Sequence, residues 1–119
     1  MKIYTISGKV IKGDGYGRKI GFPTANIERR GFANLKTKPK LGIYAGNVEI
    51  SDKIYKAGII IGPVDKNNLP KIEAHLIGFK KDIYGEKIEL RLEKFIRKFM
   101  NFETEKELII QIKKDLKKC

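Results

Sequence analysis

Six strand-like segments follow one another along the chain, and no helical segment lies between them. The segments are rich in β-branched and aromatic residues or alternate apolar with charged residues, and turn signals separate them. They cover residues 3–11, 21–27, 42–50, 53–62, 71–79 and 86–95. Strands in uninterrupted series predict an antiparallel sheet. We therefore expect a mainly β fold, a small barrel that is closed or nearly closed.

Single residues and short runs predict further details of the strands and of the connections between them. Gly8, inside the first segment, is expected to mark a bulge. Ser51 and Asp52 separate two strand-like runs and are typical of a tight hairpin. Residues 28–41 have no period, several cations and one proline, so we expect a long surface loop, which in a small domain is often a functional flap.

The chain ends in one helical segment. Thr104 followed by Glu107 has the spacing of a capping box, which predicts the start of a helix. Three apolar residues then recur at helical spacing and predict a buried stripe: Leu108, Ile112 and Leu116. We expect this helix to pack against the barrel.

Length and cysteine content limit the class of protein. The 119 residues fit one domain, residues 1–119. The only cysteine is the terminal Cys119, which excludes an intramolecular disulfide and a cysteine-based metal site and suits a reducing compartment. No apolar run approaches the roughly 20 residues of a membrane span, and the first residues lack the apolar region of a signal peptide. A cytoplasmic protein without membrane association is expected.

The formal net charge of +12 predicts attraction to polyanions such as nucleotides or nucleic acid. The charge discriminates weakly, because a surface rich in both signs is also typical of heat-adapted proteins. The densest basic cluster, the lysines at 113, 114, 117 and 118, is explained as the solvated C-terminal end of a helix.

The run GFPTANI, residues 21–27, could carry chemistry. Pro23 fixes its own φ and favours extended backbone at the residue before it. Thr24 and Asn26 are two residues apart, so on an extended chain their side chains leave from the same face. Two neutral oxygen ligands suit a hard cation such as Mg²⁺ that phosphates and water mostly hold. By itself, however, the run is more typical of a Pro-initiated strand whose Thr and Asn bond nearby backbone groups.

A glycine-rich stretch precedes this run. Its alternating glycines and one arginine could bring backbone amides and a guanidinium close to an anion: Gly13, Gly15, Gly17 and Arg18. The stretch is not a Walker motif, and it lacks the helical pattern that follows a dinucleotide fingerprint. A glycine loop without a ligand remains the alternative.

The fifth strand-like run carries a carboxylate, and its alternation places four residues on one face: Glu73, His75, Ile77 and Phe79. One histidine and one terminal cysteine give no basis for a Ser-His-Asp arrangement or a zinc cluster. The remaining groups suit phosphoryl transfer, with Glu73 as the base. The alternatives are an exposed Glu73 paired with a lysine, and His75 as a structural hydrogen-bonding residue.

The order of these motifs resembles one family. The run GKVIKGDGYGRKIGFPTANI is similar to the opening of the riboflavin kinases of the bacterial and eukaryotic type. The similarity continues through LGIYAGNV, IEAHLIGF, DIYG and FIRKFMNFETEKELIIQIKKD, and so covers nearly the whole chain.

The resemblance implies a six-stranded antiparallel Greek-key barrel with a C-terminal helix. It implies transfer of the terminal phosphate of a nucleotide, normally ATP, to the 5′-hydroxyl of riboflavin, yielding FMN. By matching position, Thr24 and Asn26 would hold Mg²⁺ and phosphates, and Glu73 would activate the hydroxyl. The fused adenylyltransferase domain of many bacterial relatives is not found, so the reaction is expected to stop at FMN.

Further site residues are implied in the same way. The loop from Gly13 to Arg18 would close over the phosphates, and Arg97 and Phe102 would help to hold the flavin. The implied partners are riboflavin or FMN and ATP or ADP, with a monomer expected and nucleic acid not expected.

Three places depart from the family pattern. The run IIGPVD at residues 60–65 replaces an Asn-Ile-Gly and a Pro-Thr-aromatic, Phe99 replaces a frequent Glu, and Gly78 replaces a frequent Asp. These departures concern the nucleotide pocket and the flavin contacts. Two rival functions are therefore kept: a non-enzymatic nucleic-acid-binding barrel, and a flavin-binding or nucleotide-binding barrel without catalysis.

Overall fold

The computed structural model describes residues 3–13, 15–79 and 82–119. Asp14, in the predicted glycine loop, and Lys80, in the turn after the fifth predicted strand, lie outside this part. The strands are β1 (Tyr4–Ile11), β2 (Ala25–Ile27), β3 (Gly42–Ile50), β4 (Lys53–Val64), β5 (Pro70–Leu76) and β6 (Lys87–Arg97). The helices are α1 (Tyr16–Lys19), α2 (Arg30–Ala33) and α3 (Glu105–Leu116). None of the helices in these ranges is long and apolar enough to cross a membrane.

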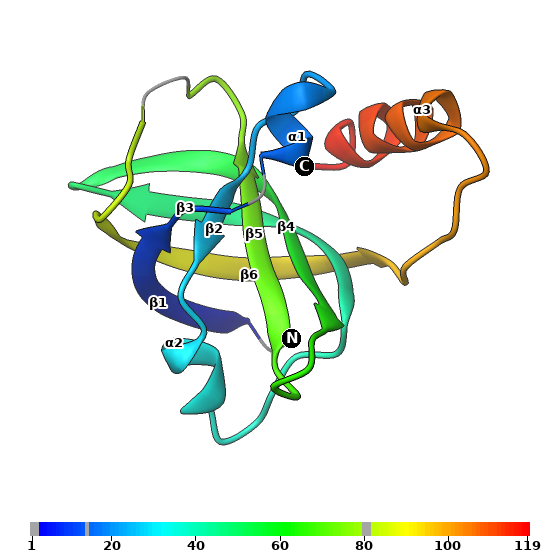
Figure 1. The fold of residues 1–119 in the computed structure, drawn as a ribbon. Helices are drawn as coiled ribbons and strands as arrows, with labels where there is room; N and C mark the ends of the chain where they lie inside the picture. The colour runs from blue at the N-terminus through cyan, green and yellow to red at the C-terminus, as the bar shows by residue number, and fades with distance from the viewer. Residues whose placement is uncertain (1–2, 14, 80–81) are drawn as a thin grey trace.

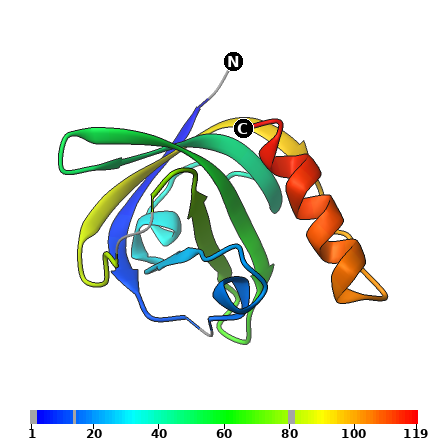
Figure 2. The same cartoon turned by 90° about the horizontal axis from the view of Figure 1, so that it is seen from above.

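The six strands form a closed antiparallel barrel in the order β1-β2-β5-β4-β3-β6 (Figure 1). Strands β3, β4 and β5 pair in sequence, and β6 returns to lie beside β3. This order is that of a Greek key. The predicted mainly β barrel with a C-terminal helix is confirmed. Viewed from above, α3 lies outside the barrel wall and to one side of it (Figure 2).

Two of the predicted connections can be checked directly. The β3–β4 hairpin is confirmed, and Ser51 and Asp52 have φ values of 47° and 69°, as a type I′ turn requires. The prediction of a bulge at Gly8 is wrong, because the β1–β6 ladder is regular there and pairs Gly8 with Ile88. Gly8 instead allows the side chain of Ile27 in β2 to lie close to the β1 backbone, since a Cβ added at Gly8 would lie 2.8 Å from Cγ2 of Ile27.

Two further predictions were wrong in part. Residues 28–41 contain the single turn α2, and its Phe32 is buried in the core. The turn was not predicted because one helical turn is too short to show a period in the sequence. Strand β5 ends at Leu76, so Ile77 and Phe79 do not continue the face of Glu73. Gly78 has φ of 77° and turns the chain away from the strand direction.

Apolar side chains from all six strands fill the barrel. The largest fully buried side chains are those of Ile6, Ile27, Val48, Ile59, Ile61, Ile72, Ile88, Leu90 and Leu92. On β5 the alternation is strict: Ile72, Ala74 and Leu76 are buried, and Glu73 and His75 are half-buried on the other face.

Helix α3 begins as predicted, since Oγ of Thr104 accepts a hydrogen bond from the backbone N of Glu107 at 3.2 Å. The predicted buried stripe is wrong in degree. Leu108, Ile112 and Leu116 are half-buried, because α3 stands off the outer wall of the barrel and these side chains line a cavity there.

Candidate active site

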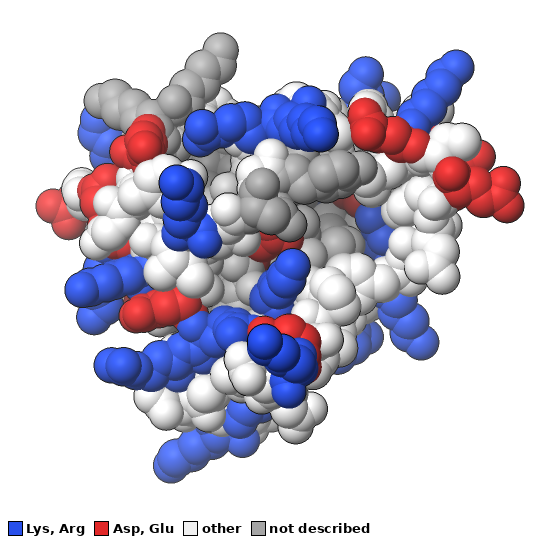
Figure 3. All heavy atoms as spheres, in the orientation of Figure 1, with Lys and Arg blue, Asp and Glu red and all other residues white. Residues whose placement is uncertain are grey.

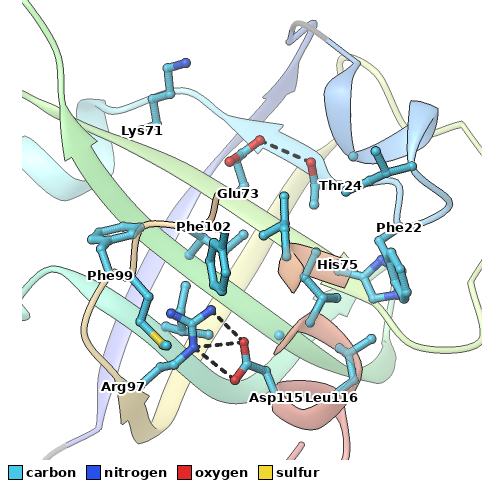
Figure 4. A pocket seen from close by; sticks show the side chains of 18 residues that line it. Phe22, Thr24, Lys71, Glu73, His75, Arg97, Phe99, Phe102, Asp115 and Leu116 are labelled. Atoms are coloured by element: carbon cyan, nitrogen blue, oxygen red, sulfur yellow. Dashed lines mark hydrogen bonds and ion pairs between the residues drawn. The ribbon is translucent and has the colours of Figure 1, made fainter. Parts of the chain in front are cut away.

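Three predicted site residues meet on the outer face of the barrel. Asn26 of β2 lies directly opposite Glu73 of β5, so the two side chains share a face. Thr24, just before β2, donates a hydrogen bond from Oγ1 to Oε1 of Glu73 at 3.2 Å (Figure 4). The short β2–β5 ladder therefore joins residues 49 positions apart in sequence.

The glycine stretch lies against this group. An added Cβ at Gly13 would lie 2.1 Å from Nδ2 of Asn26, so the Asn26 amide occupies the space that a side chain would need. An added Cβ at Gly17 would lie 2.4 Å from the Phe22 carbonyl oxygen, and the backbone N of Phe22 donates to the Gly17 carbonyl at 2.7 Å. Close approach to backbone thus requires glycine at position 17, whereas at position 13 the neighbour is the end of a flexible side chain.

This stretch is more regular than the sequence predicts. The expectation that no helical segment follows the glycines is wrong for one turn, because α1 begins at Tyr16 and the backbone N of Lys19 donates to the Gly15 carbonyl at 3.1 Å. Arg18 is exposed on α1. The turn directs the chain back towards Phe22 and Thr24.

A cavity of about 310 Å³ lies between the outer wall of the barrel and α3. Thr24 and Glu73 line one end of it, and apolar side chains line most of the rest. Both residues that the family resemblance implied for the flavin, Arg97 and Phe102, lie on it (Figure 4). The other apolar and aromatic residues of the lining are Ile20, Phe22, Ile43, Ile60, Phe99, Met100, Leu108, Ile112 and Leu116.

One ion pair links α3 to the barrel beside this cavity. Nε of Arg97 lies 3.0 Å from each carboxylate oxygen of Asp115, and Nη2 lies 2.8 Å from Oδ2. Nε2 of Gln111 adds a hydrogen bond to Oδ1 at 3.0 Å. No role for Asp115 was predicted from the sequence. The signal was present, because this carboxylate interrupts the apolar face formed by Ile112 and Leu116.

A second cavity, of about 390 Å³, lies on the other side of Thr24. Arg18 and Thr24 are the predicted site residues on its wall. The remaining lining residues are Val10, Pro23, Ala25, Ala74, Leu76, Phe79, Asp82, Ile83 and Tyr84. No site role was predicted from the sequence for Asp82 or Tyr84, although the DIYG run contains both. Thr24 lines both cavities, so ligands bound in the two would meet beside Thr24 and Glu73.

Two of the departures from the family pattern have structural partners. Asp65 pairs with Nη1 of Arg29, and this hydrogen bond lowers the pKa of the Asp65 carboxyl from its ordinary 3.8. Phe99 packs on the β4 backbone, since an added Cβ at Gly62 would lie 2.9 Å from its ring. Nothing in the structure explains Gly78 beyond its turn conformation.

The donor atoms beside Thr24 fit a hard cation. They are a hydroxyl oxygen, an amide oxygen of Asn26 and the Glu73 carboxylate, and Mg²⁺ prefers such oxygens. Within residues 3–13, 15–79 and 82–119, no three His, Cys, Asp or Glu side chains are grouped so that they could hold a metal ion. The set suits a cation that takes its other ligands from phosphate and water.

Comparisons with known proteins cover the whole chain. Residues 1–119 match the family model described as Flavokinase: Riboflavin kinase. The bifunctional riboflavin kinase/FMN adenylyltransferase of Bacillus subtilis (strain 168) is 39% identical over 117 residues, 94% of this chain and 36% of that protein. The RNA-binding riboflavin kinase RibR of the same organism is 38% identical over 116 residues, 93% of this chain and 47% of that protein. The chain thus spans between a third and a half of these two relatives.

A solved structure has a similar fold. It is described as a macrolide-efflux protein from Streptococcus pneumoniae, and it matches with a TM-score of 0.83 at 30% identity. The match covers 95% of this chain and 37% of that one.

Proposed function

The chain belongs to the riboflavin kinase family, and we propose that it transfers the terminal phosphate of a nucleoside triphosphate, normally ATP, to the 5′-hydroxyl of riboflavin to give FMN. The observation that carries the proposal is the position of Thr24. This residue lines both cavities and donates to Glu73. A phosphate donor in one cavity and an alcohol acceptor in the other would therefore react beside the Glu73 carboxylate.

The second cavity suits the nucleotide. Arg18 and Thr24 lie on its wall, where a guanidinium and a hydroxyl can bind phosphate oxygens. We assign phosphate binding to Gly13, Gly15, Gly17, Arg18, Thr24 and Asn26. Phe79 and Tyr84 offer aromatic faces to a planar base.

The first cavity suits the flavin. Its volume of about 310 Å³ is typical of a small-molecule site, and its lining is mostly apolar with a few polar groups. The tricyclic ring would lie among the aromatic and aliphatic side chains near Phe102. Arg97 would help to hold the flavin at the α3 side of the cavity, where Asp115 binds its guanidinium. The ribityl chain would then extend towards Glu73.

The reaction follows from this placement. Glu73 accepts the proton of the 5′-hydroxyl as the oxygen attacks the terminal phosphorus, and the bond to the bridging oxygen breaks to release the nucleoside diphosphate. Thr24 and Asn26 would hold Mg²⁺ on the phosphates. When bound, the ion supplies charge neutralisation for the phosphate oxygens. Glu73 and Thr24 together orient the hydroxyl and the phosphate, and orientation accounts for much of the rate of such reactions.

A turnover assay tests the proposal. The protein is incubated with riboflavin, MgCl₂ and each nucleoside triphosphate in turn, and the flavins are separated by chromatography. We expect FMN with ATP, and no FMN when the metal is chelated. Absence of FMN with every donor would overturn the proposal. Riboflavin binding without FMN would instead favour the non-catalytic barrel.

A second candidate function is RNA binding alongside the kinase activity. One relative is described as RNA-binding, and the net charge here is +12. The face shown in Figure 3 carries many Lys and Arg side chains, but acidic side chains lie among them. Binding of single-stranded RNA that weakens steeply with salt would support this function. No binding at low salt would exclude it.

We further propose that the protein acts as a monomer, because one chain supplies the walls of both cavities. Light scattering at assay concentration measures this.

A further inference from the structure

The segment that carries Thr24 lies just outside the sheet. Strand β2 begins at Ala25, and the β2–β5 ladder pairs only Ala25 with Ala74 and Asn26 with Glu73. Pro23 has no N–H to donate to a ladder. The backbone at Pro23 therefore needs another contact if Thr24 is to stay beside Glu73.

His75 of β5 supplies this contact. Its Nδ1 lies 2.7 Å from the carbonyl oxygen of Pro23. A carbonyl oxygen only accepts hydrogen bonds, so Nδ1 must carry the hydrogen. The imidazole also packs edge-on against the Phe22 ring, with centroids 5.9 Å apart (Figure 4). His75 thus contacts two consecutive residues that precede Thr24.

These contacts extend to the phosphate side of the site. Pro23 is the neighbour of Thr24, whose hydroxyl bonds Glu73. Phe22 bonds the Gly17 carbonyl through its backbone N, which ties α1 to the same segment. His75 and Glu73 lie two residues apart on one face of β5. One strand therefore presents the proposed base and also anchors the segment that carries Thr24.

We propose that His75 is a positioning residue for phosphoryl transfer: its Nδ1–H holds the Pro23 carbonyl, and so places the Thr24 hydroxyl and the glycine stretch relative to Glu73. This inference rests on the proposed kinase function. It assigns His75 a role through Thr24 and no proton transfer of its own. It also predicts which ring nitrogen matters, because only Nδ1 faces Pro23.

The first test does not need activity. His75 is the only histidine of the chain, so ¹⁵N labelling of histidine in protein without a histidine tag gives the signals of one ring. We expect the Nδ1–H form, with a ring hydrogen that exchanges slowly with water. A ring with the hydrogen on Nε2, or averaging between both forms, would overturn the inference.

The second test compares substitutions that keep different nitrogens. In His75→Asn the side-chain amide N stands close to the position of Nδ1, whereas in His75→Gln it reaches towards the position of Nε2. We expect His75→Asn to keep kcat within about threefold, and His75→Gln and His75→Ala to lose up to about 10²-fold in kcat, the size expected for a misplacement near 1 Å. The nucleotide KM should change little, because His75 lines the first cavity and not the second.

The outcomes separate the possibilities. Equal loss in all three variants would indicate that the imidazole itself transfers a proton, and equal retention would mean that the contact is dispensable; either result overturns the inference. Thermal unfolding identifies a variant that fails to fold. In that case the position of the ring hydrogen in the labelled wild-type protein tests the inference. Absence of FMN from the wild-type protein contradicts the kinase function and with it the role in transfer, whereas FMN formed by a protein with the Nε2–H ring contradicts the role of His75 alone.

Discussion

The two cavities that meet at Thr24 are built differently. The second is formed by β-strands, Arg18 of α1, the segment before β2 and residues 79 and 82–84. The first has the barrel for one wall and α3, with the segment before it, for the other. The ion pair of Arg97 with Asp115 joins these two walls. The flavin side should therefore be sensitive to how α3 docks, and the nucleotide side should depend on the short β2–β5 ladder.

This difference suggests how the site can be divided experimentally. Changes at α3 should act on riboflavin alone, and changes at Gly13 should act on the nucleotide alone. Only the residues where the cavities meet should affect transfer with both substrates bound.

The largest effect is expected for Glu73→Gln, which acts where the cavities meet. The amide keeps the size of the side chain but cannot accept the proton, so kcat should fall by about 10²–10⁴-fold. The KM values of riboflavin and ATP should stay within about threefold, as for a group that acts mainly in the transition state. Steady-state kinetics measures this, with Glu86→Gln in the exposed β5–β6 turn as the matched control. A rise of the riboflavin KM in proportion to the loss of rate would assign Glu73 to binding.

Gly13→Ala should separate the nucleotide side. The new methyl group would displace the Asn26 amide, which is the end of a flexible side chain, so the fold should tolerate the change. We expect the affinity for magnesium nucleotide to fall about tenfold, equivalent to about 1.4 kcal/mol, with riboflavin binding unchanged.

Asn26→Ala gives the matched comparison for this effect. If both substitutions act through the same amide, the double variant should be no weaker than Asn26→Ala alone. Additive losses, measured by calorimetric titration of nucleotide, would show that Gly13 acts independently of Asn26.

Asp115→Asn should separate the flavin side. The substitution removes the charge that holds Arg97, and we expect riboflavin affinity to fall several-fold while nucleotide affinity stays the same. Flavin fluorescence titration measures the first value, and calorimetry measures the second. Glu105→Gln, in the exposed first turn of α3, is the control. Equal losses for both ligands would contradict the separate construction of the cavities.

The smallest effect is expected outside both cavities, at the pair of Asp65 with Arg29. The paired Asp65 has a lowered pKa in the folded state, so its contribution to stability is complete above the ordinary value of 3.8 and is lost as the pH falls through the lower folded value. Asp65→Asn should lower the unfolding temperature at neutral pH, and the difference from wild type should shrink in acid.

The control for this pH dependence is Asp52→Asn, in the hairpin turn, where Asn also tolerates the positive φ. Unfolding curves between neutral pH and pH 2 compare the three proteins. A difference that stays constant over this range would mean that charge at Asp65 does not stabilise the fold.

Local patterns predicted much of this molecule. β-branched and aromatic content identified most of the strands, alternation identified others because side chains on a strand change sides at every residue, and Thr104 identified the start of α3 because capping involves only neighbouring residues. The same locality explains the failures. The single turns α1 and α2 are too short for a period, and the end of β5 depends on the conformation of Gly78.

The candidate site divides in the same way. The residue types and their order along the chain, at Thr24, Asn26 and Glu73, come from the sequence alone and led to the chemistry of phosphate and hydroxyl. The roles of Asp115 and of the second cavity's lining could not be predicted from the sequence, because these roles depend on contacts with distant strands.

The sequence by itself determined which face of each strand is apolar, where the chain turns, and which oxygen-bearing side chains are available. Only the tertiary structure decided that Thr24 reaches Glu73, that His75 holds the Pro23 carbonyl, and that α3 stands off the barrel to leave a cavity. The physical reason is range: periodicity and capping act over a few residues, whereas these contacts join strands and a helix far apart in the chain, and closure of the barrel sets their register.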